Sequence, residues 1–372
     1  MEKERTNFDV PALSAGGVVE QLAGLYTAAV SNGVDFRAVP PVMLWGPPGI
    51  GKSQGVRELA ARLQENTGRI VKITDVRLLL YNPIDLRGIP TANKDKTLAV
   101  WLKPKVFQMD ESRDVINILF LDEITAAPQS VQAAAYQITL DRVIGEHRLP
   151  DNCLVIAAGN RVTDRSVAYK MPKALANRLL HMEVEVDFVS WRKWAVEKGI
   201  DERVLGFLSF RQERLMTFDP SNDDRAYATP RSWEMVSNIL NSCPGSLKEL
   251  RPLIAGLIGT GTTEEFICWE EIYRELPGMK DIFSGRSCKV PARPDALYAL
   301  TSAMVGYARE HKHDMTQIAN SIRYAEKLPP DFTLLVIKDY MYLEKGYKEK
   351  LMALPEMRRW LSRKGELLNG IV

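Results

Sequence analysis

The stretch Gly46-Pro47-Pro48-Gly49-Ile50-Gly51-Lys52-Ser53 decides the fold of this chain, because it matches the phosphate-binding pattern G-x-x-x-x-G-K-[ST] at every fixed position. The apolar run at 42–45 precedes it and predicts a buried strand. Apolar residues then recur at helical spacing, at Val56, Leu59, Ala60 and Leu63. The pattern therefore stands in the strand–loop–helix context in which backbone N–H groups and a helix N-terminus face bound phosphates.

The residues of this loop predict a nucleotide site with a divalent cation. We expect Lys52 to reach the β- and γ-phosphates and the hydroxyl of Ser53 to ligate Mg²⁺. The predicted nucleotide-binding residues of the loop are Gly46, Pro47, Pro48, Gly49, Ile50, Gly51, Lys52, Ser53 and Gln54.

Length and composition restrict the class of protein. A chain of 372 residues exceeds the usual size of one hydrophobic core, so two or more folding units are expected. The hydrophobic share of 45% and the charged share of 26% are those of a globular protein, and a net charge of +2 gives no sign of a dedicated nucleic-acid binder. The four cysteines form no C-x-x-C pair, and no apolar run could span a bilayer. We expect a cytoplasmic protein with reduced thiols and no membrane contact.

Two further apolar runs end in polar residues. The run 117–121 leads directly into Asp122 and Glu123, and the run 154–159 leads into Asn160. In parallel sheets ligands bind at the carboxyl ends of the strands. We therefore expect Asp122 to hold the Mg²⁺, Glu123 to polarise an attacking water, and Asn160 to contact that water or the γ-phosphate.

The order of patterns predicts an α/β core followed by helices. Strands are expected at 42–45, 70–73, 117–121, 154–159 and 180–186, which gives a parallel five-stranded sheet. We predict a nucleotide-binding core over 1–187, with an insertion at 75–107 (a helix and a β-hairpin) and a hairpin at 141–150. A helical lid is predicted over 188–285 and a C-terminal helical extension over 286–372. Helices are expected at 13–31, 191–198, 203–212, 232–241, 247–257, 296–310, 315–325 and 332–343.

With these motifs in order, the chain resembles the AAA+ ATPases and, within them, the MoxR-like branch, over roughly residues 40–240. The matching motifs are the loop 46–53 (Walker A), 120–124 (Walker B), 131–134 with the hairpin ending at Pro150, 157–160 (sensor 1), 172–178, and Thr229-Pro230-Arg231. The chain departs from the pattern at Thr125-Ala126-Ala127, where many relatives have Asn-Arg-Ala. Further departures are Arg161, where Pro is usual, and Asn177, where Asp is common.

The resemblance implies an ATPase with ATP and Mg²⁺ as cofactors, assembled into a ring that is usually a hexamer. Asn160 would be sensor 1, Arg178 the arginine finger of a neighbouring subunit's site, and Arg231 sensor 2 of the lid, acting in cis or in trans. Such rings remodel partner proteins, often with a protein that carries a von Willebrand A-type domain. Rival candidates for the finger are Arg142, Arg161 and Arg165.

Two other functions stay open on the same core. One is a motor acting on DNA or RNA, which a basic cluster in the insertion would suit. That cluster consists of Lys94, Lys96, Lys103 and Lys105. The other is a slow nucleotide-dependent switch. Trp45, just before the phosphate loop, is expected in the core, and the four histidines show no spacing typical of a metal site.

Overall fold

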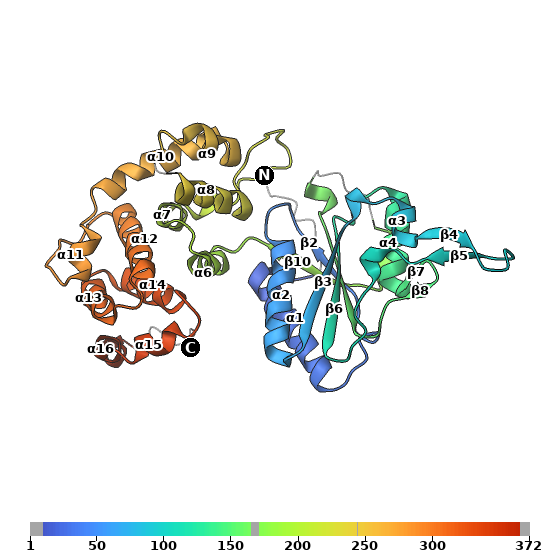
Figure 1. Cartoon of the computed structure of the whole chain (residues 1–372). Helices are drawn as coiled ribbons and strands as arrows, with labels where there is room; N and C mark the ends of the chain where they lie inside the picture. Colours follow the sequence, from blue (N-terminus) through green and yellow to red (C-terminus); the bar gives the residue numbers. More distant parts are fainter. Residues whose placement is uncertain (1–9, 165–170, 244, 365–372) are drawn as a thin grey trace. The chain divides into compact units, whose positions relative to one another are not determined.

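The computed structural model describes residues 10–164, 171–243 and 245–364, which form two compact units. The first runs to Asp187 and includes Asp219–Asp223; the second comprises Phe188–Phe218 and the residues from Asp224 onward. Figure 1 shows the first as a sheet flanked by helices, in blue to green, and the second as helices alone. None of the described helices is long and apolar enough to span a membrane. The division of the helical part at 285 stays a prediction.

Six parallel strands form the central sheet, in the order β1-β10-β2-β9-β6-β3. They are β1 (Ala12–Ser14), β2 (Val42–Trp45), β3 (Ile70–Arg77), β6 (Val115–Asp122), β9 (Cys153–Gly159) and β10 (Leu180–Glu185). The predicted α/β class and parallel sheet are confirmed, with one strand more than the expected five. The additional strand, β1, has only three residues, which is too short to show an alternating pattern. Residues 13 and 14, which we expected to begin a helix over 13–31, belong to this strand instead.

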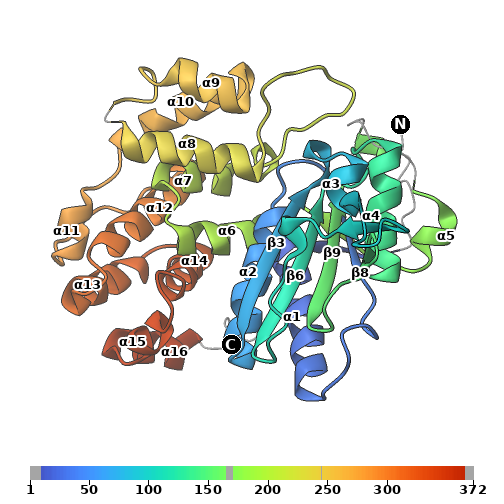
Figure 2. The same ribbon diagram turned by 45° about the vertical axis from the view of Figure 1, so that its right-hand side comes forward.

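Helices cover both faces of this sheet (Figures 1 and 2). The Ser14 hydroxyl caps α1 by accepting from the Gly17 amide at 3.0 Å, so that this helix begins at Ala15. On one face α1 and α2 pack over Leu44, and on the other α4 packs against Met43 and Leu119. The helical segments are α1 (Ala15–Ser31), α2 (Lys52–Thr67), η1 (Leu78–Leu80), α3 (Pro83–Arg87), η2 (Lys105–Phe107), α4 (Gln129–Asp141), η3 (Val162–Asp164) and α5 (Lys173–Ala176).

Two hairpins extend from the α4 side of this unit (Figure 1). Within the insertion, α3 is followed by antiparallel β4 (Ile89–Ala92) and β5 (Ala99–Leu102). The second hairpin pairs β7 (Val143–Ile144) with β8 (His147–Arg148). The two touch each other, because the His147 Nε2 lies 2.8 Å from the Trp101 carbonyl oxygen.

The described residues of the second unit form helices joined by loops and contain no strand. Its core includes an aromatic cluster in which the Phe207 ring lies 5.6 Å from that of Trp233 and 5.2 Å from that of Phe266. Neither α10 nor α11 is among the helices expected from the sequence. The helices are α6 (Phe188–Lys198), α7 (Glu202–Phe210), η4 (Gln212–Arg214), α8 (Pro230–Ser242), α9 (Arg251–Ile258), α10 (Thr260–Arg274), α11 (Met279–Phe283), α12 (Pro294–Glu310), α13 (Met315–Ala325), α14 (Pro330–Met341), α15 (Tyr347–Met352) and α16 (Pro355–Lys364).

A buried ion pair joins the first helix of this unit to α14. The Arg192 guanidinium donates to both carboxylate oxygens of Asp339, at 3.3 and 2.5 Å, and to the Ser209 hydroxyl. Both charged side chains are almost inaccessible to water. Burial raises the pKa of the Asp339 carboxyl, and the facing guanidinium opposes that shift. Each charge is therefore tolerated only in the presence of the other.

We expect Arg192→Leu to lower the free energy of unfolding by about 3–5 kcal/mol, because it leaves the Asp339 carboxylate buried without a counter-charge. The double variant Arg192→Leu/Asp339→Leu removes both charges and is expected to recover most of that loss. Urea unfolding of the full chain, followed by tryptophan fluorescence, measures both effects. Equal losses in the single and double variants would contradict this account.

Candidate nucleotide site

The phosphate loop lies between β2 and α2, as the sequence predicts. Gly46 begins it with φ 154°, and a Cβ atom there would lie 2.6 Å from the Val184 carbonyl oxygen of β10. Only glycine allows the loop to approach β10 so closely. Gly51, the residue before α2, supplies no side-chain cap. The first N–H groups of α2 therefore remain available for an anion.

The Lys52 ammonium connects the loop to the neighbouring strand. It donates to the carbonyl oxygens of Gly46 at 2.5 Å and Pro47 at 3.0 Å. It also donates to the Asn160 side-chain oxygen at 3.1 Å. Because Asn160 directly follows β9, which pairs with β2, this contact brings together two of the predicted site residues.

The two carboxylates after β6 adopt different arrangements. The Asp122 side chain is buried and accepts from the Ser53 hydroxyl at 2.9 Å. Its second oxygen accepts from the Glu123 amide at 2.9 Å. Glu123 has φ 59°, in the left-handed region that non-glycine residues seldom occupy and that is typical of functional sites. Its side chain is partly exposed, which suits a group that must meet water.

A buried hydroxyl that we did not predict as part of the site supports Asn160. The Thr125 hydroxyl accepts from the Asn160 amide at 3.0 Å and donates to the Asn160 carbonyl oxygen at 3.1 Å. Gln132 of α4 in turn donates to the backbone carbonyl oxygens of Thr125 and Ala127, at 3.1 and 2.9 Å. The sequence marks Thr125 only as a departure from the family pattern, which by itself predicts no role at the site.

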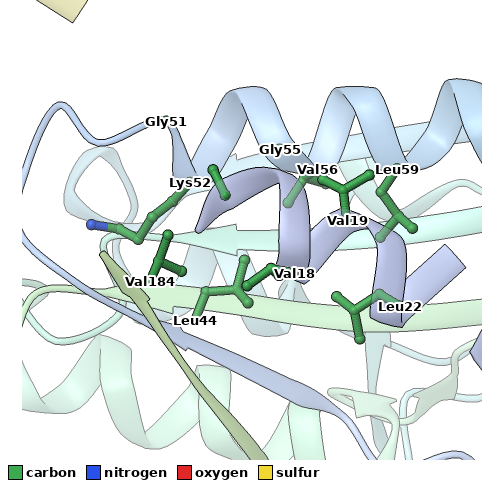
Figure 3. Close-up of a pocket in the computed structure, with 11 residues that line it drawn as sticks. Val18, Val19, Leu22, Leu44, Gly51, Lys52, Gly55, Val56, Leu59 and Val184 are labelled. Carbon is green, nitrogen blue, oxygen red and sulfur yellow. The ribbon is translucent and has the colours of Figure 1, made fainter. Parts of the chain in front are cut away.

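Apolar side chains pack between α2, the helix that follows the phosphate loop, and α1. A small cavity there is lined by side chains of α1, α2, β2 and β10, among them Val18, Leu44 and Val184. Figure 3 shows these side chains directed toward one another, whereas the Lys52 side chain extends away from them. We infer that α1 supports α2 from behind and that nucleotide would bind on the opposite side of the loop.

The predicted arginines lie in very different surroundings. Arg178, between α5 and β10, has an exposed side chain and no bonded partner within the described ranges. Arg161 pairs with Asp164 and Glu183, and the Arg142 guanidinium donates to the Cys153 carbonyl oxygen. The remaining rival, Arg165, lies outside the described residues.

Arg231 belongs to the second unit. It is the second residue of α8, where the Thr229 hydroxyl caps the helix by accepting from the Ser232 amide at 3.1 Å. Its side chain is exposed. A contact between Arg231 and nucleotide stays a prediction.

The residues present fit both implied cofactors. The Ser53 and Asp122 side chains offer two adjacent oxygen atoms, and oxygen is the ligand that Mg²⁺ prefers. A lysine ammonium and the uncapped N-terminus of α2 offer positive charge and N–H donors to phosphate oxygens. When bound, Mg²⁺-ATP would supply the phosphoanhydride bond and the cation that neutralises charge on the phosphates.

Residues 41–181 match the family described as "ATPase family associated with various cellular activities (AAA)". This part of the chain is an AAA ATPase domain. The protein is accordingly an ATPase, and the predicted enzyme class is confirmed. The match begins one residue before β2 and ends within β10, so that it includes the phosphate loop and the strand ends described above.

Solved structures similar to the chain include PCH-2 from C. elegans (13% identity, 68% of this chain and 67% of that one, TM-score 0.34). Another is a RuvB mutant from Thermotoga maritima (16% identity, 78% and 84%, TM-score 0.37). A third is ORC2 from Aeropyrum pernix (13% identity, 92% and 90%, TM-score 0.39). All three TM-scores lie below 0.5. No curated protein matches the chain.

We expect Thr125→Val to lower the ATPase turnover number about 10–100-fold, because a displaced Asn160 no longer meets the reacting groups. The substitution leaves the partly buried backbone N–H of Asn160 without its acceptor, which costs about 1 kcal/mol of folding stability. ATP affinity should change little, since the phosphate loop is untouched. Thr125→Ser keeps the hydroxyl and serves as the matched control. Steady-state kinetics of the two variants would contradict the role of Thr125 if their turnover numbers were equal.

Proposed function

We propose that this protein is a MoxR-like AAA+ ATPase that assembles into a ring, usually a hexamer, and uses Mg²⁺-dependent ATP hydrolysis to remodel a partner protein. The observation that carries the proposal is a site complete except for one group. Lys52 donates to Asn160, and the next residue, Ser53, donates to Asp122, so that two hydrogen-bonded pairs lie side by side within one unit. Arg178 of the same unit is exposed and unengaged within the described ranges.

In the proposed reaction each residue has a separate task. The Lys52 ammonium and the loop N–H groups, together with Gln54, hold the phosphates. Ser53 and Asp122 would hold Mg²⁺. Asn160 orients the attacking water against the γ-phosphate. Glu123 accepts a proton from that water as its oxygen bonds the γ-phosphorus, and the bond from the γ-phosphorus to the bridging oxygen breaks to release ADP and phosphate.

Arg178 is the group we assign to a neighbouring subunit's site. We favour Arg178 because Arg142 and Arg161 already donate to partners within their own unit. An arginine finger lowers the barrier by neutralising charge that develops on the transferred phosphoryl group. Placing it on another subunit makes hydrolysis depend on assembly. Arg231 is assigned to the same site as a further phosphate contact from the lid, in cis or in trans.

We expect Arg178→Ala to reduce turnover by about 10³–10⁵-fold, because the charge on the transferred group is no longer compensated. Nucleotide affinity should persist, as it also should in Glu123→Gln, which binds ATP without hydrolysing it. Arg113→Ala, in the exposed loop before β6, is the matched control. Turnover by purified enzyme and equilibrium binding of ATP separate these outcomes. Near-normal turnover in Arg178→Ala would remove the shared-site proposal.

The insertion provides a surface for a protein client. Several of its large apolar residues are more than half exposed, which is unusual for a soluble protein unless they bind something. These residues are Leu80, Ile84, Ile89, Leu98 and Leu102. A groove lined by Ile84, Ile89, Leu102 and Val106 also contains Lys103 and Lys105. Exposed apolar side chains together with lysines favour the binding of an unfolded or extended segment that is both apolar and acidic. A partner protein with a von Willebrand A-type domain could supply such a segment.

We expect a permanently unfolded acidic protein, such as reduced and carboxymethylated α-lactalbumin, to stimulate the ATPase. The triple variant Ile89→Ser/Leu98→Ser/Leu102→Ser should lose that stimulation and keep the basal rate, because none of these residues touches the nucleotide site. Leu253→Ser, an exposed apolar residue of the helical unit, is the control.

The same assay addresses the rival functions. Stimulation by single-stranded DNA or RNA that falls steeply with salt would favour a nucleic-acid motor, for which the exposed Lys94 and Lys96 of the insertion offer charge. Turnover near zero in the assembled ring would favour a slow switch.

A further inference from the structure

Trp45 and His181 form a polar pair between two adjacent strands. Trp45 is the last residue of β2, and His181 is the second residue of β10. The Trp45 indole N–H donates to His181 Nδ1 at 2.8 Å, and the two rings are stacked with centroids 5.9 Å apart. Trp45 is 8% exposed, so its indole N–H is bonded at a place that bulk water hardly reaches. The sequence predicts Trp45 as a core residue and gives no sign of this bond.

The second nitrogen of His181 is bonded to the segment that carries the proposed finger. Because Nδ1 accepts from Trp45, the proton of the neutral ring lies on Nε2, which donates to the Ala176 carbonyl oxygen at 2.7 Å. Ala176 is the last residue of α5, and its carbonyl oxygen also accepts from the Leu179 amide at 3.2 Å. The turn that this bond closes contains Arg178.

These bonds continue into the phosphate loop. Trp45 is followed by Gly46, whose carbonyl oxygen accepts from Lys52 and whose amide donates to the Gly159 carbonyl oxygen at 3.3 Å. A connected path of bonds thus runs from the lysine of one nucleotide site, through Trp45 and His181, to the turn of Arg178. Each member belongs to the same compact unit.

We propose that His181 is a positioning residue, which holds the Arg178 turn in register with the phosphate loop of its own subunit. This inference rests on the proposed role of Arg178 in a neighbour's site. It adds that the placement of the finger depends on the geometry of the loop that binds the subunit's own nucleotide. The connection depends on the two hydrogen bonds of the His181 ring. An apolar ring of similar volume would fill the same space without making either bond.

The first test compares two substitutions of His181. His181→Phe keeps a flat ring against Trp45 and removes both hydrogen bonds, whereas His181→Gln keeps one acceptor and one donor on neighbouring atoms. We expect His181→Phe to lower kcat about 10–100-fold with KM and ATP affinity unchanged, because a displaced group costs rate and not binding. His181→Gln should recover most of the loss. Trp45→Phe, which removes the donor to Nδ1 only, should also lower kcat, and it keeps the test available if His181→Phe does not fold.

The second test mixes subunits of different variants to determine which nucleotide site loses ATP hydrolysis. Glu123→Gln subunits bind ATP, do not hydrolyse it and keep an intact finger. If His181→Phe misplaces only the finger, its own nucleotide site regains activity beside a Glu123→Gln neighbour, so the mixture should exceed the summed rates of its parts. A mixture of His181→Phe with Arg178→Ala should stay low, since neither offers a well-placed arginine to the His181→Phe site.

The mixture of Arg178→Ala with Glu123→Gln separates this inference from the proposed function. If that mixture shows no recovery, or if Arg178→Ala alone keeps near-normal turnover, the shared site is wrong and the inference falls with it. If it recovers and the His181→Phe mixture does not, the finger assignment stands and His181 has no positioning role. Equal kcat in His181→Phe and the unchanged protein would overturn the inference directly.

Discussion

The interaction on which the nucleotide site depends is the sharing of the Lys52 ammonium between its own loop and Asn160. A lysine ammonium has three N–H groups, and Lys52 makes hydrogen bonds to three protein oxygens at this site. The arrangement requires β9 to lie beside β2, which the register of Leu44 with Ala158 provides. The sheet order is therefore part of the chemistry, because another order would leave the loop without a polar partner from the neighbouring strand.

The polar groups around this site are satisfied from the protein interior. The buried Thr125 hydroxyl bonds the Asn160 backbone at the end of β9, and the buried Gln132 side chain bonds the Thr125 backbone in turn, so that Asn160 is held by groups inaccessible to water. A buried network of this kind specifies one geometry, because any other arrangement leaves an unsatisfied group. The Thr125 side chain is short, and its hydroxyl reaches the Asn160 backbone directly.

The fold was predictable wherever the sequence repeats a pattern over several residues. The runs before Lys52, Glu123 and Asn160 gave the strands and the polar strand ends, because buried parallel strands are continuously apolar. The three-residue β1 gave no pattern. The helix α10 begins Thr260-Gly261-Thr262-Thr263, which is weak helical sequence, and the packing of Phe266 against Phe207 and Trp233 stabilises it instead. Contacts between distant segments, such as Trp45 with His181, have no local signal at all.

The described candidate arginines of the first unit, Arg142, Arg161 and Arg178, differ in what they contact. Within the described residues Arg161 forms ion pairs and Arg142 donates to a backbone carbonyl oxygen, whereas Arg178 is exposed on a turn that two hydrogen bonds to the Ala176 carbonyl oxygen hold. An arginine side chain loses conformational entropy when it binds a phosphate. Because the backbone of the turn is already held by hydrogen bonds, only the side chain has to become ordered on binding. The anchor lies on strand β10, next to the strand that enters the phosphate loop. A displacement of the phosphate loop would therefore reach the Arg178 turn through Trp45 and His181.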